Sequence, residues 1–256
     1  MHRVEFIGAG PGHPDLLTLG GLEALRRCPA VVAPLSFHRS LESLLQGKEV
    51  ESPFQMDHRT LVAWIEARLA LGSVAFLMPG DLSTFCPFQS FVAHFGDRAR
   101  VIPGVGAHAA AAAVLKKTFD LPGVAHATVL TSPRAFARQQ GRVRLRDYAR
   151  PGHTVVIYMN DMPLIDLVDE LRAGFGGEHI PIAILEKIFC PGERVTCATL
   201  GTICDKVGNR DPFQLGSTEP EPALTLVAVG EALGADEDPT WWDYRHERIW
   251  KPRGMR

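Results

Sequence analysis

The sequence predicts an α/β protein made of two domains in tandem. Short apolar runs alternate with longer segments in which leucine or alanine recurs at helical spacing, and the alternation resumes after an interruption at residues 119–124. Repeated strand-helix units favour parallel strands with helices on the faces of the sheet. We therefore expect mainly parallel or mixed sheets, a first domain at 1–120 and a second at 121–256.

The first half contains four predicted strands and four predicted helices. Apolar runs predict the strands at 4–7, 30–33, 73–78 and 99–102. Leucine spacing predicts helices at 15–27 and 60–71, the latter ending before Gly72, and two further helices are expected at 88–95 and in the alanine-rich segment 108–117. Asp120, Pro122 and Gly123 then interrupt the pattern and mark the expected boundary.

The second half repeats the alternation up to residue 229. Strands are predicted at 127–130, 154–159, 180–185, 194–199 and 224–229, with a helix at 164–173. The tail after Gly234 combines four large aromatic residues with many charges. We expect this tail to cap the second domain, with docking on a partner subunit as the alternative.

Composition excludes several classes of protein. The 256 residues are 46% hydrophobic, which excludes a disordered chain or a coiled coil. Lys+Arg 27 against Asp+Glu 29 gives 27 − 29 = −2, so no global positive field attracts nucleic acid. The five cysteines form no C-x-x-C pair, and no apolar run approaches the roughly 20 residues of a membrane helix. We expect a cytoplasmic protein without a signal peptide, a metal site or a membrane segment.

A glycine-rich turn at 8–12 follows the first strand, at the place of a dinucleotide-binding loop. The third glycine of that motif falls on His13, Pro11 lacks a backbone N–H, and no acidic residue follows the second strand. A nicotinamide or flavin site is therefore disfavoured. The turn is either a plain connection or a rigid loop that lets a bulky ligand approach the backbone.

Two further loops follow predicted strands. Asp81 comes directly after the strand at 73–78, where ligands bind in open parallel sheets. Its carboxylate either contacts a ligand or caps the helix expected to begin near Pro87. Small residues at 103–107 leave space for a ligand, or for close helix packing.

Taken together, segments 6–18, 79–81 and 101–105 resemble, in order and spacing, the tetrapyrrole methylase family. Segments 155–159 and 181–186 continue the resemblance, which covers about residues 3 to 230. The resemblance implies a two-domain methyltransferase, usually a homodimer, with S-adenosylmethionine in the cleft between the domains. Segments 27–36, 128–131 and 189–200 favour the branch that methylates a precorrin or cobalt-precorrin in cobalamin biosynthesis. Pro34 stands where uroporphyrinogen methylases carry an aspartate, which disfavours that activity.

The resemblance also implies positions for both ligands. Carried over residue by residue, the cofactor contacts fall at Pro11, Pro79, Gly80, Asp81, Thr84, Gly106, Ala107, Met159, Ile188 and Ala228. The candidates for the tetrapyrrole are Gly10, Gly12, Ser36, His38, Arg39, His108, Arg134 and Arg138. The segment at 81–86 departs from the family's usual run, which leaves the methylated ring carbon open.

Arginines recur between residues 134 and 150 and have two readings. A precorrin carries many carboxylates, which arginine binds in bidentate fashion. The alternative is an ordinary solvated surface, and RNA binding is disfavoured because only Phe136 and Tyr148 interleave with the charges.

The predicted reaction is in-line transfer of a methyl group from sulfur to a nucleophilic ring carbon. Such a step depends chiefly on alignment and exclusion of water, which agrees with the lack of an obvious triad or metal cluster in the sequence. We assign no catalytic base. The rival from another class is a nonenzymatic anion-binding or regulatory module that keeps the cleft without turnover.

Overall fold

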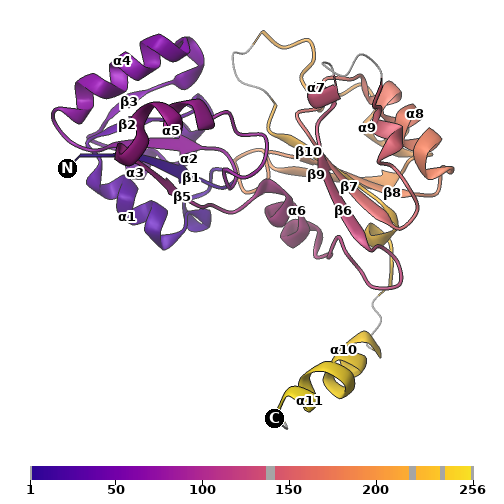
Figure 1. Ribbon diagram of the computed structural model, residues 1–256. Helices are drawn as coiled ribbons and strands as arrows, with labels where there is room; N and C mark the ends of the chain where they lie inside the picture. Colours follow the sequence, from indigo (N-terminus) through magenta and orange to yellow (C-terminus); the bar gives the residue numbers. More distant parts are fainter. Residues whose placement is uncertain (1, 137–141, 219–222, 237–239, 255–256) are drawn as a thin grey trace.

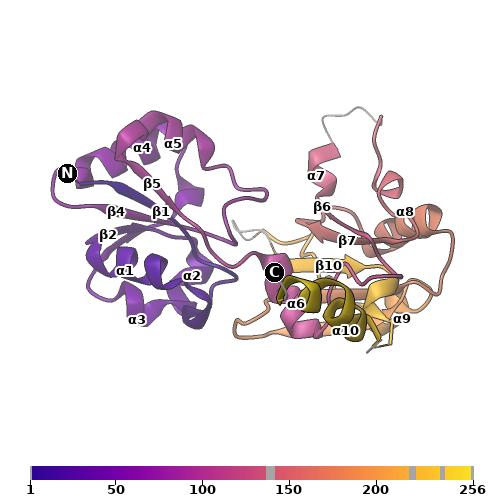
Figure 2. The ribbon, with the colours of Figure 1, turned by 60° about the horizontal axis from the view of Figure 1, so that its bottom comes forward.

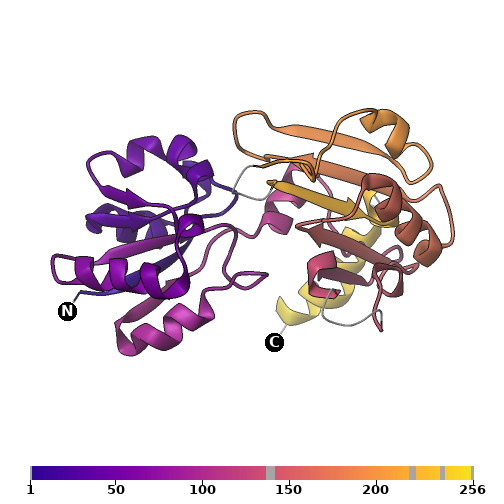
Figure 3. The ribbon, with the colours of Figure 1, turned by 90° about the horizontal axis from the view of Figure 1, so that it is seen from above.

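The computed structural model describes residues 2–136, 142–218, 223–236 and 240–254. Two five-stranded sheets lie side by side along the chain (Figure 1, Figure 3). The first sheet is parallel, in the order β3-β2-β4-β1-β5, and consists of β1 Val4–Gly8, β2 Ala30–Val32, β3 Glu49–Glu51, β4 Val74–Met78 and β5 Ala99–Ile102.

The second sheet is mixed, in the order β6-β7-β10-β8-β9. Its strands are β6 Ala127–Thr131, β7 His153–Tyr158, β8 Pro181–Glu186, β9 Arg194–Thr199 and β10 Thr225–Val229. Strands β6 and β7 are parallel, whereas β10 runs antiparallel to both β7 and β8. The predicted α/β class, with parallel or mixed sheets, is confirmed.

Helices cover both faces of the first sheet (Figure 2). Helices α1 Leu19–Arg27, α2 Leu35–Ser40 and α3 Glu42–Leu45 lie on one face, and α4 His58–Leu69 and α5 Gln89–Phe95 on the other. Because alternate strand residues point to opposite faces, Ile7 packs in one core and Phe6 in the other. The central strand β4 is accordingly apolar and buried along its whole length, as expected of a strand covered on both sides.

Helix α6 Ala107–Leu115 follows β5 in the chain but packs on the second sheet. Ala111 shares a buried cluster with Val156 of β7 and Ala183 of β8. Helices α8 Leu164–Phe175 and α9 Ile203–Val207 cover the opposite face of that sheet, and the short α7 Pro133–Phe136 follows β6. The segment between β5 and α6 thus joins the two halves.

The structure differs from the sequence predictions at a few elements. The helix expected at 15–27 is a 3-10 turn, Pro14–Leu16, followed by α1, because Leu17 is extended and the Thr18 hydroxyl accepts a hydrogen bond from the Gly21 N–H (3.1 Å). Helices α2, α3 and α9 and strand β3 were not predicted as elements. Each has only three to six residues, too short for a periodic pattern.

The C-terminal tail does not cap the second half. Helix α10 Thr240–Arg245, a π-helical turn His246–Trp250 and α11 Lys251–Gly254 form one arm that stands clear of both sheets (Figure 1). Trp242 is 66% exposed, and its ring packs against Trp250 of the same arm. The capping prediction is therefore wrong for residues 240–254. None of the described helices is long and apolar enough to cross a membrane.

Candidate active site at the joint between the two halves

Two loops at the carboxyl ends of the first sheet are fastened to each other through their backbones. The Ala9 N–H donates to the Met78 carbonyl (2.8 Å), while Gly10 and Gly80 each donate to the other's carbonyl (3.1 and 2.9 Å). Gly10 and Gly80 have φ values of +63° and +78°, which glycine adopts without steric cost. The predicted ligand loops therefore form one rigid, glycine-lined floor.

Asp81 faces the N-terminus of α6. One carboxylate oxygen accepts a hydrogen bond from the Ser83 N–H (3.0 Å), and the other lies 2.7 Å from where a Cβ would stand on Gly106. A side chain at position 106 would require this carboxylate and the His108 ring to move. Helix α5 begins at Gln89 without a side-chain cap, so the alternative role of Asp81 as its N-cap is wrong. Thr84 lies next to Asp81 in this loop, its hydroxyl 3.2 Å from that of Ser83.

Two side chains of the second half contact these loops. The Cys190 thiol donates to the Pro11 carbonyl (Sγ to O, 3.2 Å), which links the turn after β8 to the first glycine turn. The Phe85 ring lies against the Tyr158 ring at the end of β7, with centroids 5.1 Å apart. The two halves therefore meet at the strand ends, where the sequence placed the ligands.

Tyr158 also joins β7 to α6. The His108 backbone N–H donates to the Tyr158 hydroxyl oxygen (3.1 Å), and the His108 Nδ1 lies 3.0 Å from the same oxygen. Burial raises the pKa of Tyr158 to about 12, and the charge of Asp81 acts in the same direction. The phenol consequently keeps its proton at neutral pH.

The apolar cofactor candidates lie in one cluster. Ala107, Ile188 and Ala228 pack together with Tyr158, and both Ile188 and Ala228 are buried. Pro79 is exposed at the end of β4, beside Gly80. The cofactor candidates are spread over more than 200 positions of the sequence. The structure places these residues in three loops and one apolar cluster.

Met159 lies beside a small cavity of about 20 Å³, which is also lined by Asn160, Arg134, Phe213, Ala223 and Thr225. The Asn160 amide nitrogen donates to the Met162 carbonyl (2.6 Å), but its Oδ1 is buried without a partner among the described residues. A buried carbonyl oxygen calls for an N–H or O–H donor. An adenine amino group has such donors, so this position fits a nucleoside cofactor, although one ordered water also satisfies it.

Apart from His108 on α6, the described substrate candidates lie in three places. Gly10 and Gly12 lie in the first turn, where a Cβ on Gly12 would stand 2.7 Å from the Phe37 ring. Arg134 follows β6 and lies 3.9 Å from the Asp161 carboxylate. Ser36, His38 and Arg39 lie on α2. Arg138 falls outside the described residues.

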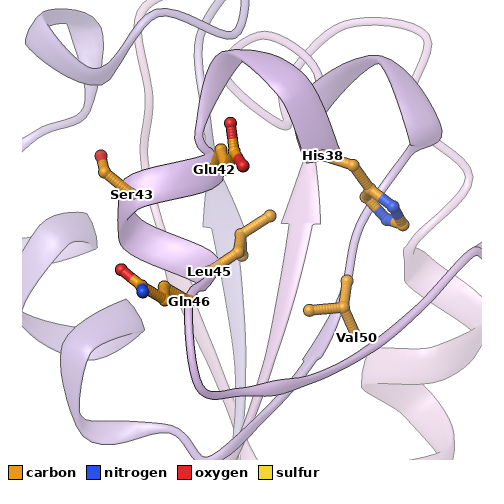
Figure 4. A pocket seen from close by; sticks show the side chains of 6 residues that line it. All are labelled: His38, Glu42, Ser43, Leu45, Gln46 and Val50. Carbon is orange, nitrogen blue, oxygen red and sulfur yellow. The ribbon is translucent and has the colours of Figure 1, made fainter.

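His38 faces a separate hollow of about 510 Å³ formed by α2, α3 and β3 (Figure 4). Its Nε2–H donates to the Ala33 carbonyl (3.2 Å), and its ring points towards Val50 across the hollow. None of the residues that line this hollow belongs to the three loops at the joint.

In the arginine-rich segment predicted at residues 134–150, Arg146 forms an ion pair with Glu170.

Four residues at the joint were not singled out from the sequence: Phe85, Tyr158, Asn160 and Cys190. Tyr158 and Asn160 flank Met159 at the end of a predicted strand. Their position at a strand end, where ligands bind in open sheets, could have identified them as site residues. Phe85 and Cys190 carried no comparable signal, because their contacts depend on how the two halves dock.

A parallel sheet with a glycine-lined floor, joined to a mixed sheet at its strand ends, defines a two-lobed α/β protein. The chain belongs to the tetrapyrrole (corrin/porphyrin) methylase family, whose model matches residues 3–204. The protein is thus a member of a family of S-adenosylmethionine-dependent methyltransferases, and it is an enzyme of this class.

The similarity to known proteins extends over almost the whole chain. The precorrin-4 C(11)-methyltransferase of Pseudomonas aeruginosa is 30% identical over 97% of this chain and 98% of its own. A cobalt precorrin-4 methyltransferase has the same fold, with a TM-score of 0.72 over 90% of this chain and 95% of its own, at 22% identity. The uroporphyrin-III C-methyltransferase of Thermus thermophilus, solved with S-adenosyl homocysteine, has a TM-score of 0.68 at 27% identity and covers 91% of this chain and 99% of its own.

Proposed function

We propose that the protein uses S-adenosylmethionine to methylate a ring carbon of a precorrin or cobalt-precorrin in cobalamin biosynthesis, at C11 of precorrin-4. The full-length similarity to a precorrin-4 C(11)-methyltransferase supports this choice, as do segments 27–36, 128–131 and 189–200. The alternative is C20 of precorrin-2, because the Gly-Asp-Leu-Ser-Thr-Phe run at 80–85 also resembles the enzymes with that specificity.

The observation that carries the proposal is the carboxylate of Asp81 beside Gly106. This polar group lies next to the apolar cluster of Ala107, Ile188 and Ala228, at the joint of the two halves. Apolar walls with a few fixed polar groups are typical of sites that bind a flat nucleoside and orient it. The unpartnered Oδ1 of Asn160 adds an acceptor on the side of the second half.

When bound, S-adenosylmethionine supplies an electrophilic methyl group on a positively charged sulfur. Asp81 and the apolar cluster hold the cofactor in this proposal, and the glycine turn that contains Gly10 and Gly12 lies towards the macrocycle. The residues of the joint act by aligning the two ligands and excluding water, which contributes several kcal/mol to such reactions.

The proposal includes a homodimer, as the resemblance implies, and a cytoplasmic location, which the cysteine pattern favours. Size-exclusion chromatography with light scattering tests the dimer directly. An elution mass near 56 kDa, twice the chain mass of 28.0 kDa, is expected. A mass of one chain at micromolar concentration contradicts this part of the proposal.

The decisive experiment incubates the protein with S-adenosylmethionine labelled at the methyl carbon and a panel of precorrins. The proposal expects the label at C11 of the precorrin-4 product, located by mass spectrometry and NMR. Label at C20 of precorrin-2 instead establishes the alternative. No transfer to any member of the panel contradicts the proposed reaction.

A further inference from the structure

The hydroxyl of Tyr158 contacts both the backbone and the side chain of His108. The Tyr158 hydroxyl receives the His108 backbone N–H at 3.1 Å and lies 3.0 Å from the ring Nδ1. Tyr158 belongs to β7, whereas His108 lies in the first turn of α6, so the contact fixes both the helix start and the imidazole.

The two contacts favour one position for the proton of the imidazole ring. The phenol keeps its own proton, because burial raises the pKa of Tyr158 to about 12. Among the described residues, the acceptor next to that O–H is the His108 Nδ1. Donation of this O–H to Nδ1 leaves the ring proton on Nε2.

The Nε2–H is left without a protein acceptor. No described residue forms a hydrogen bond with it, and it does not belong to the buried unpartnered atoms of the chain. The ring lies beside Asp81 at the joint: a Cβ on Gly106 would stand 2.6 Å from the His108 Cε1 and 2.7 Å from the Asp81 Oδ2. His108 thus presents a fixed N–H donor next to the candidate cofactor residue.

We propose that His108 donates its Nε2–H to a side-chain carboxylate of the tetrapyrrole, with the tautomer set by Tyr158. The inference rests on the proposed function and deepens it. Tetrapyrroles of this class carry acetate and propionate groups, and a carboxylate accepts a stronger hydrogen bond than a neutral oxygen does. His108 acts in this account by orienting the substrate, and it does not act as a base, because its free nitrogen already carries a proton.

The tautomer is measured by two-dimensional NMR of the protein labelled with ¹⁵N in its histidine rings. The wild-type protein is expected to show His108 with its proton on Nε2. Tyr158→Phe removes the hydroxyl while keeping the ring, and the His108 signals are expected to shift towards a mixture of both tautomers. A wild-type His108 with its proton on Nδ1 contradicts the inference.

Two substitutions test the Nε2–H donor of His108 separately from the contact between His108 and Tyr158. His108→Asn keeps an acceptor near the place of Nδ1 but has nothing at Nε2, whereas His108→Gln places an amide N–H near Nε2. Binding of uroporphyrin III, an octacarboxylate tetrapyrrole, is followed by absorbance titration. His246→Asn, in the C-terminal arm, is the matched control.

His108→Asn is expected to weaken uroporphyrin III binding roughly tenfold or more, and His108→Gln to stay within about threefold of the wild type. The affinity for S-adenosylhomocysteine is expected to be the same in both variants. Unchanged uroporphyrin binding in His108→Asn, or an equal loss in His108→Gln, overturns the inference. The titration measures binding and needs no turnover. An absence of methyl transfer therefore contradicts the proposed function, while the titration still decides whether His108 binds the tetrapyrrole.

Discussion

Gly104 packs directly against the backbone of Gly8. A Cβ on Gly104 would stand 2.2 Å from the Gly8 carbonyl oxygen and 2.5 Å from that of Gly80. No rotamer change relieves such a contact, since both neighbours are backbone atoms. The loops after β1, β4 and β5 therefore form the floor of the site only when position 104 carries no side chain.

Gly104→Ala is accordingly expected to lower the free energy of unfolding by about 2 to 4 kcal/mol, because the backbone must move to admit the methyl group. Gly216→Ala, where no atom lies within 4 Å of the added Cβ, is the control and should change stability by less than about 0.5 kcal/mol. Denaturant unfolding measures both. Equal stabilities of the two variants contradict the described packing.

The ion pair between Arg146 and Glu170 predicts part of the acid sensitivity. The Arg146 Nε donates to both Glu170 carboxylate oxygens, at 3.1 and 3.2 Å, and these bonds lower the pKa of Glu170. A carboxyl group with a lowered folded-state pKa contributes its full stability above the unfolded value of about 4.3 and loses it as the pH falls further.

Glu170→Gln is therefore expected to cost about 1 kcal/mol at pH 7 and progressively less below pH 4. The measurement is urea unfolding between pH 7 and pH 3. Glu23→Gln serves as the control, because Glu23 is exposed and lies 3.9 Å from Arg27. A difference between wild type and Glu170→Gln that persists unchanged at pH 3 contradicts the prediction.

The cysteines should differ widely in reactivity. Burial raises the pKa of both Cys28 and Cys86 to about 11, so about one thiol in a thousand is ionised at pH 8. Cys197 is exposed. Iodoacetamide at pH 8 is expected to label Cys197 first and Cys28 last, as followed by peptide mass spectrometry. Labelling of Cys28 at the rate of Cys197 in the folded protein is the contrary result.

The C-terminal arm should contribute little to the stability of the folded chain. Its described residues pack on one another, as in the stacked rings of Trp241 and Tyr244, and none is buried. Deleting residues 240–256 is expected to change Tm by less than about 2 °C. A fall of more than about 5 °C indicates instead that the arm packs on the body of the chain or on a second copy.

Much of the fold was predictable because each main strand is a run of apolar residues long enough to be recognised. Strand β4 was predicted to within one residue because it is apolar and buried throughout, and the edge strands β5 and β9 were predicted with their observed bounds. Strand β3 is only three residues long and carries two glutamates, because it lies at the sheet edge. Local pattern therefore identified edge strands as well as central ones, and missed the short, charged β3.

The site was predictable only in part, for a different reason. Asp81 and Gly106 follow strands directly, so parallel topology alone placed them together. The contacts of Tyr158 with Phe85 and His108 require three segments to meet, and nothing local in the sequence encodes that meeting. His38 shows the converse, since a histidine chosen as a substrate candidate hydrogen-bonds a nearby backbone carbonyl and faces another hollow.

The central claim is that the joint between the two halves binds a sulfur-containing nucleoside beside Asp81. Isothermal titration calorimetry with S-adenosylhomocysteine tests it most directly, using wild type, Asp81→Arg and the control Asp97→Arg on an exposed turn. The account predicts a Kd on the order of 1 μM for wild type and control, and binding at least about tenfold weaker for Asp81→Arg. No binding by the wild type at millimolar ligand, or equal affinity in all three proteins, contradicts it.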